Sequence, residues 1–300
     1  MQSFPPLSDC HYLVGPTAAG KTAAGVEMAR RLGAEILSLD SMAVYRGMDI
    51  GTAKPDAAAR AAVPHHLLDL VEPNQDFSIA DYLVAAHRVA AEVRERGREV
   101  LFVGGTPLYL KALLCGIAEG PGPDWATRER LVDEARQNGP EQLHRRLAEV
   151  DPTAAAKLHP NDVRRIVRAL EVVERTGRPI SAGQTHFHQP ISPEVAAAVT
   201  VLDWPRAMLH DRIIARVDAM FAAGLVEEVR GLLARHPALG RTASQAAGYR
   251  EIADYLGGRM DLAGAIERTK ARTRQLVRRQ LTWFRSLEGC RWVDMSRAAP

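Results

Sequence analysis

Eight residues near the start of the chain have the types and spacing needed to hold a diphosphate or a triphosphate. They are Gly15-Pro16-Thr17-Ala18-Ala19-Gly20-Lys21-Thr22, which fit the pattern G-x-x-x-x-G-K-[S/T] between an apolar stretch and a helical pattern. Glycines in such a turn let backbone N–H groups point at phosphate oxygens, and the helix that follows adds its positive N-terminal end. Lys21 would supply a point charge, and Thr22 a hydroxyl ligand for Mg²⁺. A chance glycine turn is the alternative, but the coincidence of strand, full motif and helix favours a phosphate site.

Asp40 is the second candidate for chemistry. It ends a strand predicted at 35–40, and the carboxyl ends of strands in a parallel sheet face the crevice in which ligands bind. We therefore expect its side chain to point towards the bound phosphates, where it could bind a metal or accept a proton. The alternative is a local role, in which Asp40 caps the next turn together with Ser41.

A phosphate loop by itself favours ATP chemistry, so the first hypothesis is a small-molecule or nucleotide kinase. In phosphate-loop enzymes that hydrolyse ATP, an apolar strand usually ends in an Asp that organises Mg²⁺. The strand predicted at 100–103 ends instead in Gly104-Gly105-Thr106, without a carboxylate. This weakens the kinase hypothesis and leaves it open, beside a third hypothesis of a noncatalytic RNA-binding protein.

Two predicted helices carry basic residues in a pattern suited to a polyanion. On the helix predicted at 161–176, Arg164, Arg168 and Arg175 share one face, while apolar residues occupy another. Between 268 and 285 the chain has seven Lys and Arg residues and no acidic residue. Such surfaces bind RNA in a salt-dependent way, although a solvated helix face is the ordinary alternative. Side chains that could add base contacts or stacking are Gln275, Gln280, Trp283 and Tyr249.

Composition narrows the class of protein. The chain has 300 residues, of which 46% are apolar and 25% charged, which is enough to bury a core. Cys10, Cys115 and Cys290 are far apart, which argues against a zinc knuckle or a disulfide framework and fits a reducing cytoplasm. The histidines show no metal-binding spacing. No leader and no apolar run of bilayer length is recognisable, so we expect a cytoplasmic protein without a membrane partner.

The elements that must position these groups alternate along the chain. Strands predicted at 12–14, 35–40 and 100–103 are separated by helical patterns, which predicts a parallel sheet. Prolines then break a series of short helices, and a strand at 199–204 returns the chain to the sheet. We predict an α/β fold with a P-loop NTPase-like parallel sheet, flanking helices and a helical insertion. The expected parts are the first part of the core at 1–120, the helical insertion at 121–190, and the rest of the core with basic helices at 191–300.

Several longer motifs accompany the phosphate loop. They are Asp40-Ser41, Tyr45-Arg46-Gly47-Met48-Asp49-Ile50-Gly51-Thr52-Ala53-Lys54-Pro55, Gly104-Gly105-Thr106 with Leu108-Tyr109, His159-Pro160-Asn161-Asp162, Gly248-Tyr249-Arg250-Glu251, and Arg278-Arg279-Gln280 with Thr282-Trp283-Phe284. With these motifs the sequence resembles the bacterial tRNA dimethylallyltransferases, also called tRNA isopentenyltransferases, over nearly its whole length.

The resemblance implies transfer of a dimethylallyl group from dimethylallyl diphosphate to N6 of the adenosine immediately 3′ of the anticodon, with release of diphosphate. The phosphate loop would then hold the prenyl diphosphate, so no Asp for ATP hydrolysis is required. By resemblance, Asp40 accepts the N6 proton, while Lys21, Mg²⁺ and the Thr17 hydroxyl stabilise the leaving group. Arg212 and Arg216 match family arginines on the diphosphate side.

The resemblance also implies that tRNA is the partner of this enzyme, which we expect to be a monomer. The residues that it places along the tRNA are Asp40, Ser41, Met42, Ala43, Thr106, Arg128, Arg164, Arg165, Ile166, Val167, Arg168, Gln245, Gly248, Tyr249, Arg250, Arg278, Arg279 and Gln280. One departure is Ala43, because many relatives carry Gln at this position.

Overall fold

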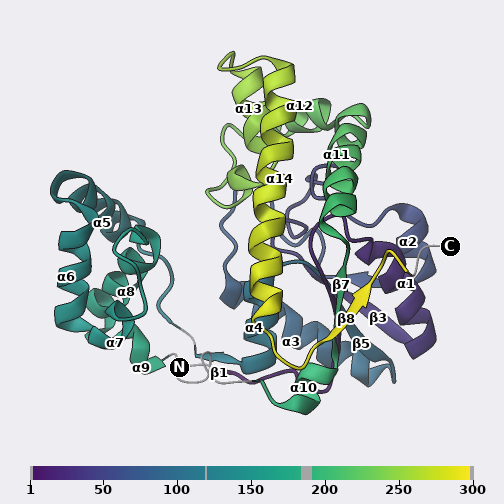
Figure 1. The fold of residues 1–300 in the computed structure, drawn as a ribbon, viewed down its shortest axis with the longest axis horizontal. Coiled ribbons are helices and arrows are strands. Elements are labelled where there is room, and N and C mark those ends of the chain that lie inside the picture. Colours follow the sequence, from purple (N-terminus) through teal and green to yellow (C-terminus); the bar gives the residue numbers. More distant parts are fainter. Residues whose placement is uncertain (1–2, 119, 184–190, 298–300) are drawn as a thin grey trace. The chain divides into compact units, whose positions relative to one another are not determined.

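The structure is a computed structural model, and it describes residues 3–118, 120–183 and 191–297. The chain forms two compact units, a core unit of residues 7–114 and 190–300 and a helical unit of residues 1–6 and 115–189 (Figure 1). The border expected after residue 120 therefore lies after residue 114. The first six residues, expected in the core, belong to the helical unit because β1 (Ser3–Phe4) pairs antiparallel with β6 (Ile117–Ala118).

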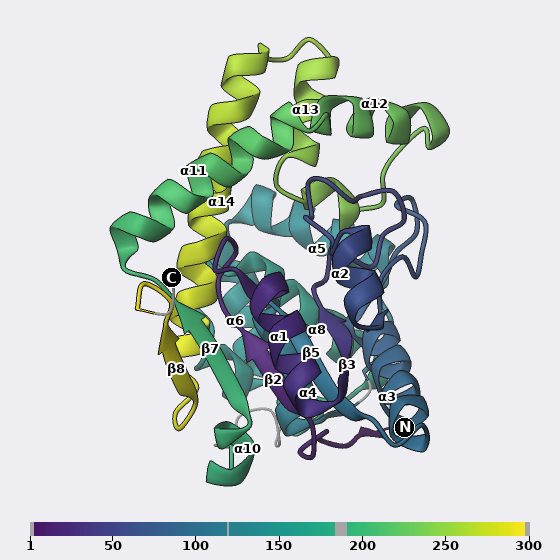
Figure 2. The same ribbon diagram turned by 90° about the vertical axis from the view of Figure 1, so that its right-hand side faces the viewer.

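A parallel sheet forms the centre of the core unit, as predicted (Figure 2). Among the described residues it has six strands, in the order β4 (His65–His66), β3 (Ala34–Leu39), β5 (Glu99–Gly104), β2 (His11–Val14), β7 (Val199–Asp203) and β8 (Arg291–Asp294). Every neighbouring pair in this order is parallel. The α/β prediction is confirmed.

The register of the three central strands brings their carboxyl ends into one row. Gly104, at the end of β5, is paired with Val14 of β2 on one side and with Leu39 of β3 on the other. Each of these strands continues into a segment that the sequence marked as functional, so the phosphate loop, Asp40 and Thr106 must lie at the same edge of the sheet.

The helices of the core unit follow the alternating order predicted for them. Their bounds are α1 (Lys21–Leu32), α2 (Ala57–Ala62), α3 (Ile79–Glu95), α4 (Pro107–Cys115), α10 (Pro193–Ala197), α11 (Arg206–Ala222), α12 (Leu225–Arg235), η1 (Ala243–Gln245), α13 (Tyr249–Leu256) and α14 (Leu262–Arg285). No helix in the described part of the chain is both long and apolar enough to cross a bilayer.

Small and aromatic side chains fix how the helices pack on the sheet. Gly25 of α1 lies so close to Val103 of β5 that a Cβ at this glycine would come within 3.1 Å of the valine Cγ2. Since successive strand residues point to opposite faces, Phe102 faces the other side, where it stacks on Tyr12 with ring centroids 5.3 Å apart. Dense packing on both faces therefore holds the carboxyl edge in place.

The helical unit is a small bundle, and the absence of strands predicted for 121–190 holds for its described part. Its helices are α5 (Trp125–Asn138), α6 (Pro140–Val150), α7 (Pro152–Ala155), α8 (Val163–Thr176) and α9 (Ile180–Gly183). Asp124, Asp151 and Asp162 each cap one of these helices. The side chain of each accepts the backbone N–H of the residue three positions later. Leu131, Leu143 and Ile166 are buried in its core.

Three elements of the core unit were not predicted individually. The strand β8 contains a single partly buried residue, Val293, between exposed neighbours, so its sequence carries little strand signal. The helices α12 and α13 lie between α11 and α14 in the sequence. They pack together with the loop after β3 in one apolar cluster that includes Val229 and Ile252, so their stability depends on contacts that are distant in sequence.

Gly104 offers a test of this packing. A Cβ at this position would lie 2.1 Å from the carbonyl oxygen of Leu39, so Gly104→Ala should destabilise the protein by at least about 2 kcal/mol in urea unfolding. Gly231, in α12, is the control, because a Cβ there meets nothing within 4 Å, and Gly231→Ala should stabilise by about 0.5 kcal/mol. Equal stability of the two variants would contradict the close backbone approach.

Candidate active site

The three segments that follow the central strands come together at the carboxyl edge of the sheet. The phosphate loop follows β2, Asp40 follows β3, and Gly105-Thr106 follows β5. The backbone N–H groups of Gly105 and Thr106 both donate to the carbonyl of Leu39, at 3.1 Å each. A glycine is needed at 105, because a Cβ there would lie 2.7 Å from Gln280 Nε2 and 3.2 Å from the carbonyl oxygen of Gly15.

Side chains from distant parts of the chain hold the phosphate loop in place. Gln280 of α14 accepts from the Thr17 N–H at 3.0 Å and donates to the Gly105 carbonyl at 2.6 Å. Arg212 of α11 donates to the Ala18 carbonyl at 2.9 Å, and its guanidinium stacks 4.1 Å above the Trp204 ring. The Trp204 indole in turn donates to the Ala19 carbonyl at 3.1 Å.

The loop itself is arranged for an anion. Ala18 has a left-handed backbone with φ of 66°, a conformation that costs a non-glycine residue free energy and is maintained by the surrounding bonds. Gly20 is the N-cap residue of α1, and no side chain caps this helix end. The N–H groups of the first helical turn are therefore left for a ligand, and they add to the positive end of the helix dipole.

Two cationic side chains lie beside this loop. The Lys21 ammonium donates to the Pro16 carbonyl at 2.7 Å. Burial and the neighbouring Arg216 guanidinium lower the pKa of Lys21 to about 7, against the opposing effect of Asp40. Burial likewise lowers the pKa of Arg216, and Asp40 opposes it. Two partly desolvated cations with one carboxylate between them form a site that favours a bound anion.

Asp40 is held in a defined orientation. One of its carboxylate oxygens accepts the Met42 N–H at 2.8 Å, and the Ser41 N–H donates to the Thr106 hydroxyl at 3.0 Å. The local turn role, kept open from the sequence, is therefore present in the structure. It leaves the second carboxylate oxygen without a hydrogen bond to any described residue, so the turn does not exclude a role in proton transfer.

The structure offers few ligands for a metal ion. Within the described residues there is no group of three or more His, Cys, Asp or Glu side chains that could hold one. Thr22, in the first turn of α1, is exposed beside the phosphate loop. This donor set fits an ion held mainly by substrate phosphates and water, which is the usual mode for Mg²⁺.

The structure corrects the roles expected for two residues of the core unit. Gln280 is buried and bonds the phosphate loop, so it is not an exposed reader of bases. Tyr249 is fully buried, its hydroxyl donates to Glu228 at 2.6 Å, and burial raises the pKa of this hydroxyl. Stacking of Tyr249 on a base is therefore excluded in this structure. Gly248 is buried as well, with its N–H bonded to Glu251.

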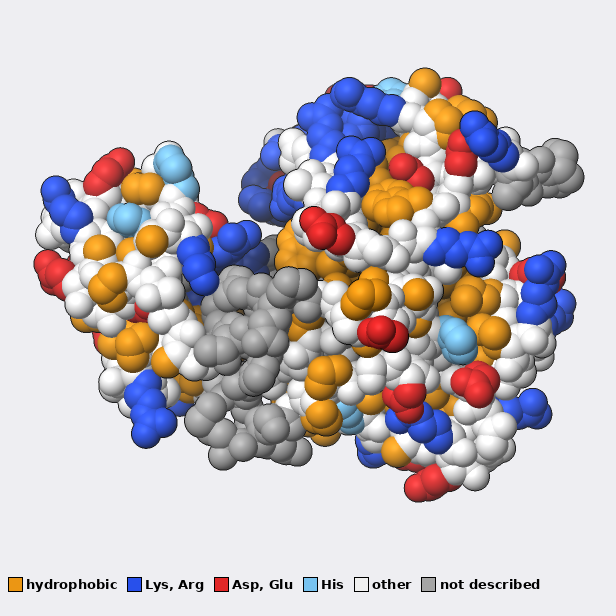
Figure 3. Space-filling view, turned by 60° about the horizontal axis from the view of Figure 1, so that its bottom comes forward, with side chains coloured by type: hydrophobic (Ala, Val, Ile, Leu, Met, Phe, Trp, Pro, Cys, Tyr) orange, Lys and Arg blue, Asp and Glu red, His pale blue; other side chains and the backbone are white. Residues whose placement is uncertain are grey.

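The basic surface of α14 is smaller than its sequence indicates. Lys270 pairs with Asp218 and Glu267, and Arg272 pairs with Glu251. Arg278 and Arg279 are exposed, and their side chains form no ion pair within the described part of the chain. Figure 3 shows Lys and Arg side chains gathered over part of the core unit.

In the helical unit, a buried carboxylate organises the arginines. Glu171 is fully buried and accepts from Arg128, at 2.9 Å for both bonds, from Arg168 and from the Asp124 N–H. Burial raises the pKa of Glu171, but these hydrogen bonds outweigh it and lower the pKa below its usual value. Arg168 and Arg175 also bond the carbonyls of Pro121 and Gly122. These arginines hold the chain at the start of the unit.

The other residues that α8 was expected to present to tRNA fall into two groups. Arg164 and Arg165 are exposed. Ile166 and Val167 are buried at 0% and 4% exposure in the core of the unit. Their apolar side chains pack in the cluster with residues of α5, α6 and α7, so these two side chains do not face a ligand, and their expected place along the tRNA stays a prediction for the helix. The spacing of apolar residues along the helix was the sequence feature that indicated their burial.

Two residues of the site were missed by sequence reasoning. Trp204 was counted as part of a strand, and Glu228 lies in a helix that was not predicted individually. Glu228 accepts the backbone N–H groups of Asp49, Ile50 and Gly51. No local pattern could have revealed either role, since the backbone groups that these two side chains bond are more than 170 positions away.

Two family models match the chain. The model described as IPP transferase matches residues 43–287, and the model described as isopentenyl transferase matches residues 8–67. The first covers most of the chain, including the loop after β3 and the basic helix α14.

Curated relatives are similar over nearly their full length. A tRNA dimethylallyltransferase of Geobacter metallireducens is 50% identical, with 93% of this chain and 90% of the relative covered. One from Rhodopirellula baltica is 47% identical, with 97% and 89% covered.

Solved structures agree with these relatives. The tRNA isopentenylpyrophosphate transferase of Bacillus halodurans superposes with a TM-score of 0.66 at 41% identity, with 95% of this chain and 89% of the other covered. A eukaryotic dimethylallyltransferase described as acting on tRNA superposes with a TM-score of 0.75 at 26% identity, with 95% and 73% covered.

The lowered pKa of Lys21 predicts proton uptake when an anion binds. The free side chain, with a pKa of about 7, is mostly neutral at pH 8. A bound anion favours the charged form and raises the pKa, so binding of inorganic pyrophosphate at pH 8 should take up close to one proton, and at pH 6 almost none. Calorimetry in buffers of different ionisation enthalpy measures this number.

The matched control for this experiment is Lys21→Arg, since arginine stays charged over this pH range. Protonation of the pyrophosphate itself contributes equally to both proteins and cancels in the difference. The same proton uptake by the wild type and the Arg variant would show that Lys21 is already charged in the free protein.

Proposed function

The chain belongs to the family of tRNA dimethylallyltransferases, and on that premise we propose how its residues carry out the transfer. The protein is an enzyme that transfers a dimethylallyl group to tRNA. The donor is dimethylallyl diphosphate and the acceptor is N6 of the adenosine immediately 3′ of the anticodon. The bond between the allylic carbon and the diphosphate oxygen breaks, the bond from that carbon to N6 forms, and N6 loses a proton. Nothing in the comparisons favours the kinase hypothesis over this function.

The observation that carries this assignment is the pair of cations at the phosphate loop. Lys21 and Arg216 each have a pKa lowered by burial, and Lys21 also by the charge of Arg216. Breaking the allylic C–O bond places negative charge on the departing diphosphate. The two cations, the loop N–H groups and the Thr17 hydroxyl would stabilise that charge where it develops.

Arg212 has a role in the phosphate loop beside the one expected of it. Its Nε–H donates to the Ala18 carbonyl, and its guanidinium stacks on Trp204. Its terminal Nη2 lies 3.7 Å from the position that a Cβ of Gly20 would occupy. We propose that Arg212 both shapes the phosphate loop and offers its remaining N–H groups to the diphosphate.

Asp40 is the proposed proton acceptor. An exocyclic adenine amine is a weak nucleophile because its lone pair is delocalised into the ring, so a carboxylate that accepts the N6 proton as the bond forms lowers the barrier. The turn to Met42 fixes the orientation of this carboxylate and occupies one of its oxygens. The negative charge also lies close enough to oppose the pKa changes of Lys21 and Arg216.

We also propose Mg²⁺ as the cofactor, held by the Thr22 hydroxyl, diphosphate oxygens and water. When bound, the ion would neutralise charge on the leaving group. Thr22 is exposed at the first turn of α1, where it is free to reach a ligand of the phosphate loop.

The tRNA is proposed to contact the exposed basic and polar side chains. In the core unit these are Gln245, Arg250, Arg278 and Arg279, and in the helical unit Arg164 and Arg165. Arg128 and Arg168, which are partly exposed but bonded to Glu171, would contribute a fixed guanidinium surface. The monomeric state and the cytoplasmic location expected from the sequence stay predictions.

Replacing Asp40 by Asn tests its role as base. The Asn side-chain carbonyl can still accept the Met42 N–H, so the turn is kept while the base is lost. We expect transfer of label from dimethylallyl diphosphate to unmodified tRNA, in the presence of Mg²⁺, to fall by at least about 100-fold, with both substrates still bound. Asp56→Asn is the control, because Asp56 caps α2 and Asn caps equally well. Full transfer by the Asp40 variant would show that Asp40 is not the base. Absence of transfer by folded wild-type protein that binds both substrates would reject the proposed function.

Replacing Arg278 and Arg279 by Ala tests the RNA surface. Loss of two phosphate contacts should weaken tRNA binding and reduce the slope of log K against log salt by about one to two units. The control is the double variant Arg30→Ala, Arg31→Ala. It removes the same charge from the last turn of α1, at the end of that helix away from the phosphate loop. If both double variants changed the slope equally, the effect would be one of net charge and not of contact.

A further inference from the structure

The motif from Gly47 to Pro55 has no role in the proposed chemistry, yet it is tied to the rest of the core unit by an unusual set of bonds. It lies in the loop between β3 and α2, which begins at Asp40. At its centre, three successive backbone N–H groups point at one carboxylate, that of Glu228 on α12. Asp49 donates at 3.0 Å, Ile50 at 2.8 Å and Gly51 at 3.4 Å.

A fourth donor completes the set. The Tyr249 hydroxyl, at the start of α13, donates to Glu228 at 2.6 Å. The Tyr249 ring lies directly against the loop, since a Cβ at Gly51 would come within 2.4 Å of its Cε2. Only a glycine fits at 51, and only an acceptor with several lone pairs satisfies all four donors. We call Glu228, Tyr249 and the N–H groups of 49–51 the carboxylate bracket.

A buried lysine forms a second set of bonds within the same loop. The Lys54 side chain is 1% exposed, and its ammonium donates to the Tyr45 carbonyl at 2.6 Å and to Asp49 at 2.7 Å. It also pairs with Asp69. Lys54 therefore ties Tyr45, before the carboxylate bracket, to Asp49 within it, so we expect a displacement at 49–51 to reach the segment before it.

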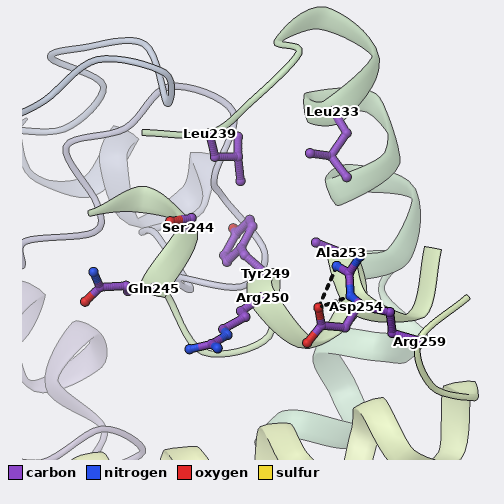
Figure 4. Close-up of a pocket in the computed structure, with 9 residues that line it drawn as sticks. All are labelled: Leu233, Leu239, Ser244, Gln245, Tyr249, Arg250, Ala253, Asp254 and Arg259. Carbon is purple, nitrogen blue, oxygen red and sulfur yellow. Dashed lines mark hydrogen bonds and ion pairs between the residues drawn. The ribbon is translucent and has the colours of Figure 1, made fainter. Parts of the chain in front are cut away.

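The carboxylate bracket joins the loop after β3 to the start of α13, and each of these two parts adjoins a segment that is expected to meet the tRNA. One is 40–43, which leads into the loop. The other is 245–250, which ends at Tyr249 and Arg250. Tyr249 lines a cavity of about 280 Å³, and in Figure 4 the side chains of the exposed Gln245 and Arg250 lie to one side of its ring. The buried end of the second segment is thus anchored while its exposed side chains are presented outward.

We propose that Glu228 is a positioning residue for tRNA binding, which holds the segments 40–43 and 245–250 in a fixed relation through the carboxylate bracket. The proposal rests on the proposed function. Glu228 does not touch the phosphate loop, which is held separately by Gln280, Arg212 and Trp204. Its loss should therefore act on tRNA and not on the diphosphate.

The test is Glu228→Ala in the full chain. Removal of the carboxylate leaves four donors, three of them partly buried, without their common acceptor, and we expect the Kd and KM for tRNA to rise about tenfold. We expect pyrophosphate affinity to stay within about twofold, and kcat at saturating tRNA likewise, because Ser41 and Thr106 still hold the Asp40 turn. Glu228→Gln, which keeps a carbonyl acceptor and can donate to the Tyr249 oxygen, should restore most of the tRNA affinity.

Glu227→Ala is the matched control, because its side chain is 70% exposed and pairs only with Arg230 in the described part of the chain. Unchanged tRNA affinity in the Glu228→Ala protein would overturn the proposal, and so would a parallel loss of pyrophosphate affinity, which indicates a general loss of structure. If this variant does not fold, Tyr249→Phe replaces it. It removes one donor and keeps the ring, and it should weaken tRNA binding about two- to threefold with pyrophosphate binding unchanged. Transfer by the wild type is measured separately, so its failure would reject the function without bearing on these binding constants.

Discussion

The close approach of backbone between β5 and β3 is the constraint on which the site depends. Because Gly104 has no side chain, the carbonyl oxygen of Leu39 can lie 2.1 Å from the position that a Cβ would occupy. The same oxygen accepts the backbone N–H groups of Gly105 and Thr106. This contact brings the segment after β5 against the start of the Asp40 turn. Because Gly104 is also in register with Val14, the phosphate loop begins at the same place. Asp40, the proposed proton acceptor, and the phosphate loop thereby lie at one edge of the sheet.

Electrostatics then gives that edge its chemistry. The desolvated ammonium of Lys21 and the guanidinium of Arg216 repel each other, and Asp40 is the carboxylate that opposes the resulting pKa changes. Such a site is less favourable empty than filled with a polyanion. In the proposed reaction a diphosphate would relieve the repulsion and would gain charge as the allylic bond breaks, so the groups that bind the substrate would bind the leaving group more strongly.

The arginines divide into those that hold the protein together and those that face outward. Arg128, Arg168 and Arg272 each bond a carboxylate that is at most 2% exposed, and buried carboxylates must be paired in this way. Arg164, Arg165, Arg278 and Arg279 remain exposed. The segments that carry the outward side chains are bonded to acids, namely the buried Glu171 and the partly buried Glu228. In this chain these acids thus set the geometry of the surface proposed for RNA.

The sequence by itself determined the phosphate loop, the parallel sheet, the helical insertion and the family, because each is written in local spacing or in long motifs. It also placed Asp40 and Thr106 at strand ends, and the parallel register confirms that they share an edge with the loop. What only the tertiary structure decided is which polar side chains face a ligand and which bond the protein. Gln280 and Arg212 bond loop residues 263 and 194 positions away, and Tyr249 is buried against Gly51. A polar residue on a helix has the same type and spacing in either role, and its role depends on the partner that the fold brings to it.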